Sequence, residues 1–328
     1  MSETRTQQWV APKTIRLPDF IICGAMKCGT STVHTLLGKH PEIYIPDPEI
    51  NFFDMDDIFQ HSDFYFRRDG RFLGPDISAD PIGYWEWYHD FFRDAPESSL
   101  VGEDSTCYLP SARASHRISL QSKPIKTIIC LRQPSLRAYS QYWHMLKTGR
   151  ALFNFEDTIK FTPNYVLERS MYLSQIRDFT KHIPKDRVFF FILEEFLQDK
   201  EAVVRKLLEF LSLDYGDLPE NALETHSNIT KLPRNIELQA FKNRMLRTFG
   251  NKHYEGRLPF SPKLGQQRSS YFPMVVNKLH NVANPIKLRP IPKMDTRTKI
   301  FLDDFFMREL EGLGDVVGAD INQLWFQE

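Results

Sequence analysis

The sequence predicts an α/β protein built on a doubly wound parallel sheet flanked by helices. Three runs rich in apolar and β-branched residues, at residues 20–24, 125–131 and 187–193, have the length and composition of buried strands. Each run is followed by a segment whose apolar residues have helical spacing. Strands that alternate with helices in this way are typical of a parallel sheet covered on both faces.

The first strand ends at Gly24, and the spacing of apolar residues predicts a helix from Thr30 onward. Residues 46–54 contain two prolines and are expected to form a loop, followed by a polar, aromatic insertion up to about residue 82. Residues 84–92 have helical spacing and no helix breaker. Their aromatic side chains either form helical core or contribute a wall to a binding site, namely Tyr84, Trp85, Trp87 and Tyr88.

A short strand is expected at residues 100–103, before the strong one at 125–131. Pro134 then occupies the position of a first helical residue, and the helix continues through Leu146. The strand at 187–193 has the composition of a fully buried strand, and a helix is expected from Asp199 to Leu211.

The last third of the chain is expected to consist of helices and proline-rich loops from about residue 215 to 295, with a mobile segment at 257–265. A final amphipathic helix is predicted over 298–313. No linker marks a second domain, so residues 1–328 are expected to form one domain. Residues 1–17 are expected to be a flexible N-terminal segment.

The chain has 328 residues, with 42 Lys and Arg balanced by 42 Asp and Glu. This balance gives no indication of a nucleic-acid partner or an anionic membrane, so any anion site must be local. The polar N-terminus lacks the apolar region of a secretory signal, and no apolar run is long enough to span a membrane. The sequence predicts no oligomeric state.

The cysteines form no Cys-x-x-Cys pair and have no histidine at metal-ligand spacing. We therefore expect reduced thiols in a cytoplasmic protein, with no metal site. The four cysteines are Cys23, Cys28, Cys107 and Cys130.

The loop between the first strand and its helix reads Gly24-x-x-Lys27-x-Gly29-Thr30-Ser31-Thr32. Backbone N–H groups at a helix N-terminus bind phosphate oxygens, and a lysine adds a positive charge that can follow a leaving oxygen. We call residues 24–32 the phosphate loop. The ATP-binding loop G-x-x-x-x-G-K-[ST] does not match, because Lys27 precedes the second glycine instead of following it.

The phosphate loop resembles the 5'-phosphosulfate loop of sulfotransferases that use 3'-phosphoadenosine-5'-phosphosulfate (PAPS). In that family Lys-x-Gly-Thr is followed by a helix and then His-Pro, and this chain has His40-Pro41 at the helix end. The resemblance implies a P-loop-like sheet and PAPS as the sulfuryl donor, with 3'-phosphoadenosine-5'-phosphate (PAP) as product. It also implies that the donor's 5' end is bound by Lys27, Cys28, Gly29, Thr30, Ser31 and Thr32.

The segment Leu131-Arg132-Gln133-Pro134-Ser-Leu-Arg137-Ala-Tyr-Ser140 resembles the 3'-phosphate element of the same family. By this resemblance Arg132 and Ser140 bind the 3'-phosphate, a role that suits a charged fork and a hydroxyl at the start of a helix. The family's Asp is Gln133 here. Residues 191–197, 204–211, 292–299 and 324–325 also resemble family segments, but these resemblances support the fold more than the chemistry.

Glu49 is the leading candidate for the general base, which must reach the acceptor proton from the side opposite the leaving group. The segment Glu49-Ile-Asn51-Phe-Phe-Asp54 resembles the Glu-Pro-His-Phe-Phe-Asp segment of heparan-type enzymes, with Asn51 in place of the histidine. Asp104 stands where those enzymes have a lysine, which weakens the case for an anionic, heparan-like acceptor. Asp104 is either a second acid/base group or a solvated or capping residue.

His34, His144 and His226 are further candidates for the base, although a lone histidine is more often structural. Insertions at about residues 55–95 and 215–290 are expected to cap the acceptor site. The favoured function is sulfuryl transfer from PAPS to a hydroxyl, less so an amine, of a carbohydrate or small-molecule alcohol. The alternatives are a P-loop nucleotide kinase or NTPase, and a non-catalytic nucleotide-binding protein of the same fold.

Overall fold

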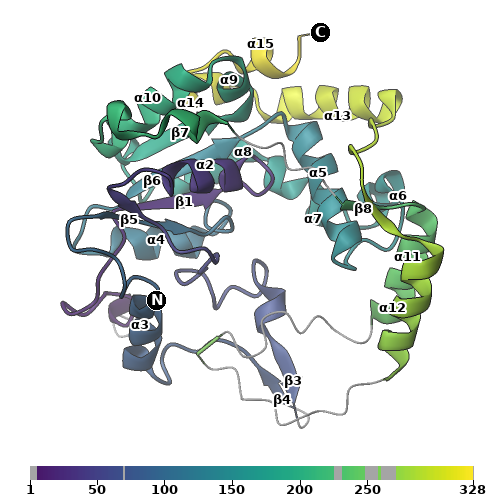
Figure 1. The fold of residues 1–328 in the computed structure, drawn as a ribbon, viewed down its shortest axis with the longest axis horizontal. Coiled ribbons are helices and arrows are strands. Elements are labelled where there is room, and N and C mark those ends of the chain that lie inside the picture. Colours follow the sequence, from purple (N-terminus) through teal and green to yellow (C-terminus); the bar gives the residue numbers. More distant parts are fainter. Residues whose placement is uncertain (1–5, 69–70, 225–230, 248–257, 260–270, 328) are drawn as a thin grey trace.

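The computed structural model describes residues 6–68, 71–224, 231–247, 258–259 and 271–327. Its centre is a five-stranded, fully parallel sheet in the order β2-β5-β1-β6-β7, flanked by helices (Figure 1). The expected doubly wound α/β fold is therefore confirmed. The strands are β1 (Phe20–Gly24), β2 (Ile43–Tyr44), β5 (Leu100–Asp104), β6 (Lys126–Leu131) and β7 (Val188–Ile192).

The helices follow the expected alternation closely. Each strand predicted at 20–24, 125–131 and 187–193 leads through a loop or a short helix into a longer helix. The last of these helices, α10 (Lys200–Leu211), buries Leu and Val side chains and ends at its predicted last residue. The helices near the sheet are α2 (Thr30–Leu37), α3 (Pro81–Asp90), α4 (Ala112–Ser119), α5 (Pro134–Lys147), α8 (Tyr172–Phe179), α9 (Leu193–Gln198) and α10 (Lys200–Leu211).

The remaining elements lie in the insertions and the C-terminal part. The helices are α6 (Phe155–Phe161), α7 (Pro163–Val166), α11 (Ile236–Leu246), α12 (Tyr271–Ala283), α13 (Thr296–Glu309), α14 (Leu313–Val317) and α15 (Ile321–Trp325). Two antiparallel ribbons pair β3 (Phe66–Arg68) with β4 (Arg71–Leu73), and β8 (Lys231–Pro233) with β9 (Ile286–Leu288).

Strand β1 occupies the middle of the sheet and is completely buried. The chain moves from β1 to the side of β2 and β5, and later to the other side with β6 and β7. In doubly wound folds, ligands bind outside the carboxyl ends of the strands where the winding direction reverses. The topology therefore puts the end of β1, and the phosphate loop after it, at the expected binding position.

Residues 6–17 differ from the expected flexible segment. Trp9 is buried against Phe52, with ring centroids 5.6 Å apart, and the guanidinium of Arg117 lies 3.5 Å from the centre of the Trp9 ring. The Gln121 side-chain amide donates to the Trp9 carbonyl at 2.7 Å. An apolar indole that fills a site in the core orders the segment around it, which polar composition alone did not indicate.

Three other expectations need correction. Strand β7 is an edge strand, so Phe189 and Phe190 are only partly buried rather than enclosed on both faces. The last long helix ends at Glu309, four residues before the predicted end, because the chain turns at Gly312 with φ of 83° before α14. Of the predicted mobile segment, residues 257 and 260–265 lie outside the described residues.

The aromatic residues of α3 form core rather than a binding wall. Tyr84, Trp85 and Tyr88 are buried, and Tyr88 stacks on Phe52 with centroids 4.4 Å apart. Trp87 is partly buried against the same cluster. The helical-core interpretation of this segment is confirmed.

Candidate active site

The phosphate loop leaves β1 with a backbone that only certain residues adopt. Gly24 has φ of 118°, and a Cβ atom there would lie 2.5 Å from the Thr106 carbonyl oxygen. Gly29 has φ of 90° and caps α2 without a side-chain hydrogen bond. Because the first N–H groups of a helix have no partner within it, this cap leaves donors available for an anion.

Lys27 lies between these glycines with φ of 70°, an uncommon conformation for a residue with a side chain. Its Nζ lies 3.2 Å from Nδ1 of His144 on α5. Burial lowers the pKa of Lys27, an effect that the nearby Glu49 carboxylate opposes. The loop thus holds the lysine with few neighbours of opposite charge, which prepares it to meet an anionic ligand.

The charged neighbours of the His144 ring are cations. Its Nε2 lies 2.9 Å from the guanidinium of Arg150, on the side opposite Lys27. Burial, together with the charges of Lys27, Arg150 and Lys147, lowers the pKa of His144 to about 3. A histidine with so low a pKa stays neutral at ordinary pH and is a weak base.

Arg132 and Ser140 line one cavity of about 220 Å³, together with Tyr139 and residues 291–294. Arg132 also donates to the Lys27 carbonyl at 3.4 Å, which connects this cavity to the phosphate loop. The two residues predicted to share one phosphate therefore lie on the same cavity. Lys293 lies on it as well and was missed as a site residue, because its segment is distant in sequence from Arg132 and Ser140.

Gln133 is a structural residue. It is buried, and its backbone N–H donates to the Glu194 carboxylate at 3.0 Å while its side-chain amide donates to the Trp325 carbonyl at 2.7 Å. These contacts fasten the start of α5 to the C-terminal helices. Ser135, also at the start of α5, donates to Asp303 of α13 at 2.5 Å.

Glu49 lies in the loop that follows β2 and precedes β3, and Thr106 donates to its Oε2 at 3.1 Å. Part of the Glu49 side chain is accessible to solvent. The surrounding protein nevertheless removes water from its carboxyl group, and this desolvation, together with the charge of Asp104, raises the pKa of Glu49 to about 7. The hydrogen bond from Thr106 and the charge of Lys27 act in the opposite direction. A carboxylate with a pKa near neutrality is suited to accept a proton.

Asp104 ends β5 and is buried. Nδ1 of His34, on α2, lies 3.3 Å from its Oδ2, whereas Oδ1 has no hydrogen-bond partner among the described residues. Burial raises the pKa of Asp104, and the bond with His34 opposes the increase. His34 and Asp104 therefore form a pair whose charge acts on Glu49.

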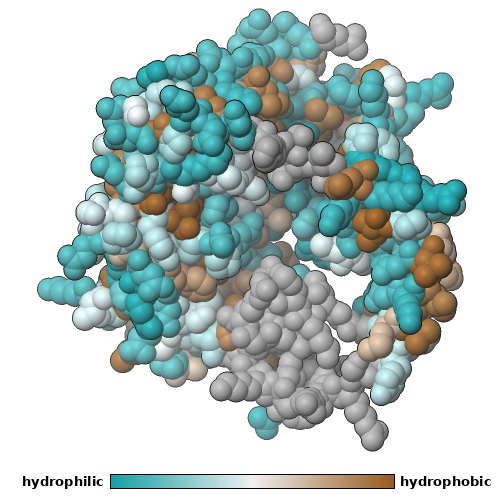
Figure 2. Space-filling model, viewed as in Figure 1, coloured by the Kyte–Doolittle hydropathy of each residue, from teal (hydrophilic) through white to brown (hydrophobic). Residues whose placement is uncertain are grey.

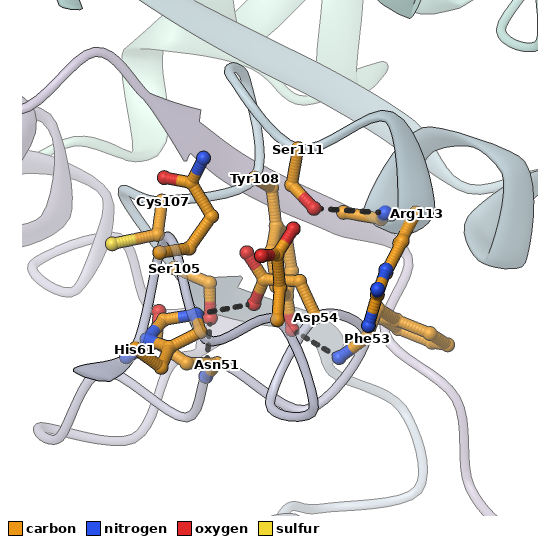
Figure 3. A network of polar contacts seen from close by, with 12 residues as sticks. Asn51, Phe53, Asp54, His61, Ser105, Cys107, Tyr108, Ser111 and Arg113 are labelled. Atoms are coloured by element: carbon orange, nitrogen blue, oxygen red, sulfur yellow. Dashed lines mark hydrogen bonds and ion pairs between the residues drawn. The ribbon is translucent and has the colours of Figure 1, made fainter. Parts of the chain in front are cut away.

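The loop that carries Glu49 is fastened to the loop after β5. Figure 3 shows Asn51 and Phe53 beside Ser105 and Tyr108, whose hydroxyls accept from the two backbone N–H groups at 2.8 and 3.0 Å. Behind them Glu103 accepts from Ser105, Tyr108 and Tyr88 at 2.7, 2.6 and 2.5 Å. These bonds fix the position of the Glu49 loop relative to the end of β1.

Asn51 departs most clearly from the family segment. It is buried with φ of 54°, and its Oδ1 has no partner among the described residues. Two residues beyond Phe52, Asp54 pairs with His61 through a 2.7 Å contact between Oδ1 and Nε2 (Figure 3). His61 thus supplies a buried imidazole in this loop, a feature that the sequence did not reveal.

The other predicted residues are placed as follows. Cys28, Gly29, Thr30, Ser31 and Thr32 all lie at the start of α2 or just before it, and Cys28 Sγ lies 3.4 Å from the Tyr172 hydroxyl. His226 lies outside the described residues. In the described ranges, no three His, Cys, Asp or Glu side chains gather in a way that could hold a metal ion, and no helix is long and apolar enough to cross a membrane.

The parallel sheet and the glycine-bearing loop after β1 define an α/β protein of the P-loop-like class. The family model described as "Sulfotransferase domain" matches residues 17–253, well over half of the chain. This chain therefore belongs to the sulfotransferase domain family, as its loop motifs predicted.

Individual relatives are more distant. The mouse protein "Heparan sulfate glucosamine 3-O-sulfotransferase 3A1" is 25% identical over 206 residues, covering 60% of this chain and 46% of the relative. The human "Bifunctional heparan sulfate N-deacetylase/N-sulfotransferase 2" is 29% identical over 144 residues, covering 43% of this chain and 14% of the relative. The chain spans about half the length of most of the curated relatives it matches.

Among solved structures, a sulfotransferase from Alicyclobacillus acidocaldarius is similar over 94% of this chain and 99% of its own, with a TM-score of 0.58 and 21% identity. At this identity the similarity concerns the fold. It extends beyond the family match, which ends before α12 and before the cavity residues 291–294.

Proposed function

We propose that this chain transfers the sulfuryl group of PAPS to a hydroxyl of a carbohydrate or small-molecule alcohol. The observation that carries the proposal is the position of Lys27, whose carbonyl accepts from Arg132 and whose ammonium interacts electrostatically with Glu49. One lysine thus connects a cavity suited to a 3'-phosphate with a carboxylate suited to an acceptor. The 3'-phosphate cavity, the lysine for the 5'-phosphate and the carboxylate for the acceptor thus follow one another in the same order as the parts of the donor and the acceptor that they would bind.

In the proposed reaction, the acceptor oxygen forms a bond to sulfur while the bond from sulfur to the 5'-phosphate oxygen breaks. The acceptor proton passes to Glu49, and the negative charge that develops on the leaving phosphate is stabilised by Lys27 and the N–H groups at the start of α2. Arg132 and Ser140 hold the 3'-phosphate. Positioned donors and cations supply the stabilisation, as expected for transfer of a highly charged group.

The acceptor side carries carboxylates rather than cations. Glu49 and the buried Asp104 repel one another's charge. A neutral polyol can donate hydroxyls to such groups, whereas a polyanion would be repelled. We therefore favour a neutral hydroxyl-bearing acceptor over an anionic polysaccharide. An amine could also approach the carboxylates, but it would bind as an ammonium and would have to lose a proton before it attacks.

The test combines ligand binding with turnover. Thermal unfolding is measured with PAP and, separately, with ATP and Mg²⁺, for wild type, Lys27→Ala, Arg132→Ala and the exposed control Arg177→Ala. A ligand that binds only the folded state raises the unfolding temperature. We expect stabilisation by PAP in wild type and Arg177→Ala, a much smaller shift in Arg132→Ala, and no comparable effect of ATP.

Transfer is then followed with labelled PAPS against neutral sugars, small alcohols, amines and heparan-type polysaccharides. Stabilisation by ATP with Mg²⁺ instead of PAP would indicate the kinase or NTPase alternative, which the family match does not favour. Binding of PAP with no sulfated product from any acceptor would favour a non-catalytic nucleotide-binding protein.

A further inference from the structure

Helices α11 and α12 pack against each other through polar side chains. His280 on α12 is buried, and its Nε2 lies 2.9 Å from Oε1 of Gln239 on α11. Gln239 in turn donates to Asn243 at 2.9 Å, and Asn243 donates to the Leu146 carbonyl at the end of α5. Buried polar groups that satisfy one another form a specific contact, so this face of α12 is fixed against the rest of the protein.

The opposite face of α12 is apolar and points to solvent. Tyr271, Val275, Leu279 and Val282 are 80%, 52%, 67% and 81% exposed. At about 100° per residue these four positions fall within one quarter or so of the helix circumference, on the side away from His280. We call these four residues the apolar stripe. Figure 2 shows hydrophobic residues gathered at the right edge of the molecule, where Figure 1 places α12.

The distribution is the reverse of an ordinary surface helix, which buries its apolar face and exposes its polar one. The exposed surface continues on β9, where Ile286 and Leu288 are also exposed on either side of Lys287. Monomeric proteins rarely expose apolar side chains in such a contiguous group unless it contacts something.

The charge of the same region identifies the kind of partner. Residues 231–294 contain 13 Lys and Arg but only two Asp and Glu, although the chain as a whole is balanced. Lys278 lies beside the apolar stripe, and Lys287 and Arg289 follow on and after β9. A group of exposed apolar side chains flanked by cations is typical of surfaces that bind anionic membranes.

We propose that the apolar stripe and its flanking cations dock the protein on an anionic phospholipid surface, with α12 lying in the plane of the interface. A second copy of the chain fits less well, because a two-fold contact would bring the two basic faces together. A soluble polyanion would satisfy the cations but leave the apolar stripe exposed. The inference is independent of the reaction proposed above.

The test is co-sedimentation of the full chain with vesicles of phosphatidylcholine, with and without phosphatidylglycerol. We expect wild type to bind the anionic vesicles, and to be released from them as salt is added. The stripe variant is Leu279→Ser with Val282→Ser, and its control is Ile82→Ser with Leu197→Ser, two apolar residues of similar exposure elsewhere. The charge variant is Lys278→Glu, Lys287→Glu and Arg289→Glu, and its control is Arg177→Glu, Lys185→Glu and Lys206→Glu.

We expect the stripe and charge variants each to lose at least about tenfold in vesicle affinity, and the controls to match wild type. Loss in the charge variant alone would assign the surface to a soluble polyanion and overturn the proposal. Equal binding to neutral vesicles, or binding to neither, would overturn it as well. So would lipid-free dimerisation that the stripe variant abolishes. Unfolding temperatures check that the variants fold, and the salt titration of wild type tests the charge requirement without any substitution.

Discussion

Nζ of Lys27 lies 3.2 Å from Nδ1 of His144, while the guanidinium of Arg150 approaches the other ring nitrogen. A neutral imidazole has one nitrogen that accepts and one that carries a hydrogen, so only one of these cations can donate a full hydrogen bond to it. The low pKa of His144, to which both cations contribute, keeps the ring neutral. His144 is thus placed to orient Lys27 rather than to remove a proton from the acceptor.

Substitution of His144 tests this positioning role. We expect His144→Leu to lower kcat about tenfold with little change in PAP affinity, because Lys27 loses a hydrogen bond of ordinary strength. His144→Gln should restore part of the rate, since its amide oxygen can accept from the ammonium. The pH profile should keep its shape in both variants, and disappearance of a titration near neutrality in His144→Leu would instead identify His144 as the base.

The ionisation of Glu49 should control the acidic limb of the pH profile of kcat/KM. Because its pKa is about 7 and the base must be ionised, kcat/KM should rise with pH through this value and then level off. Glu49→Gln should lower kcat by a factor on the order of 10² to 10⁴. Asp47→Asn, an exposed neighbour in the same loop, is the control.

Asp104 should shift that titration. Its negative charge raises the pKa of Glu49, so Asp104→Asn should move the rising part of the pH profile to lower pH. The measurement is the pH dependence of kcat/KM for the variant beside wild type. An unchanged midpoint would mean that Glu49 and Asp104 do not interact in the working enzyme.

Lys293 should contribute to nucleotide affinity through the 3'-phosphate. It lines the same cavity as Arg132 and Ser140, so we expect Lys293→Ala to weaken PAP binding by roughly tenfold, the effect of one charge-assisted contact. AMP, which lacks the 3'-phosphate, should bind both proteins equally. Lys185→Ala serves as the control, and an equal loss for AMP and PAP would mean that Lys293 supports the cavity without contacting the phosphate.

The fold, the position of the phosphate loop and the location of Arg132 and Ser140 on one cavity could be predicted because they depend on short segments. A buried strand, a glycine loop and a helix start are contiguous in sequence, and the phosphate loop and the start of α5 each occupy fewer than a dozen or so residues. Lys293 could not be found in this way, because it reaches Arg132 only through the path of the chain after β9. The role of His144 likewise depends on its contacts with Lys27 and Arg150 rather than on any local pattern.

The apolar stripe and its flanking cations could not be predicted from the sequence for a different reason. The balance of 42 basic and 42 acidic residues suggested no anionic partner, yet the basic residues of 231–294 are offset by acidic ones elsewhere in the chain. The inverted amphipathicity of α12 was equally hidden, because apolar spacing on a helix predicts a stripe but not which side of it is buried.

Glu103 should make stability depend on pH. Burial raises its pKa from 4.5 to about 7 despite three donated hydrogen bonds, so the folded state holds a proton that the unfolded chain has already released between these values. Stability should therefore fall as pH rises from about 4.5 to about 7 and change little above, by at most about 3 kcal/mol. Glu103→Gln should flatten this part of the curve in urea unfolding at pH 5 and pH 8, relative to wild type. A curve of the same slope in both proteins would show that Glu103 titrates normally.

Trp9 should anchor the N-terminal segment. Its ring is buried between Phe52 and the Arg117 guanidinium, and Trp85 donates from its indole to the Gln8 carbonyl at 3.0 Å. We expect Trp9→Ala to lower the free energy of unfolding by about 3–5 kcal/mol, as for other large-to-small core substitutions. Val10→Ala, at the exposed neighbouring position, should change it by no more than about 0.5 kcal/mol. Because Phe52 follows Asn51 in the Glu49 loop, the loss of Trp9 should also lower kcat. If deletion of residues 1–17 left the free energy of unfolding and kcat unchanged, Trp9 would not anchor the segment. The N-terminal segment would then be flexible, as the sequence predicted.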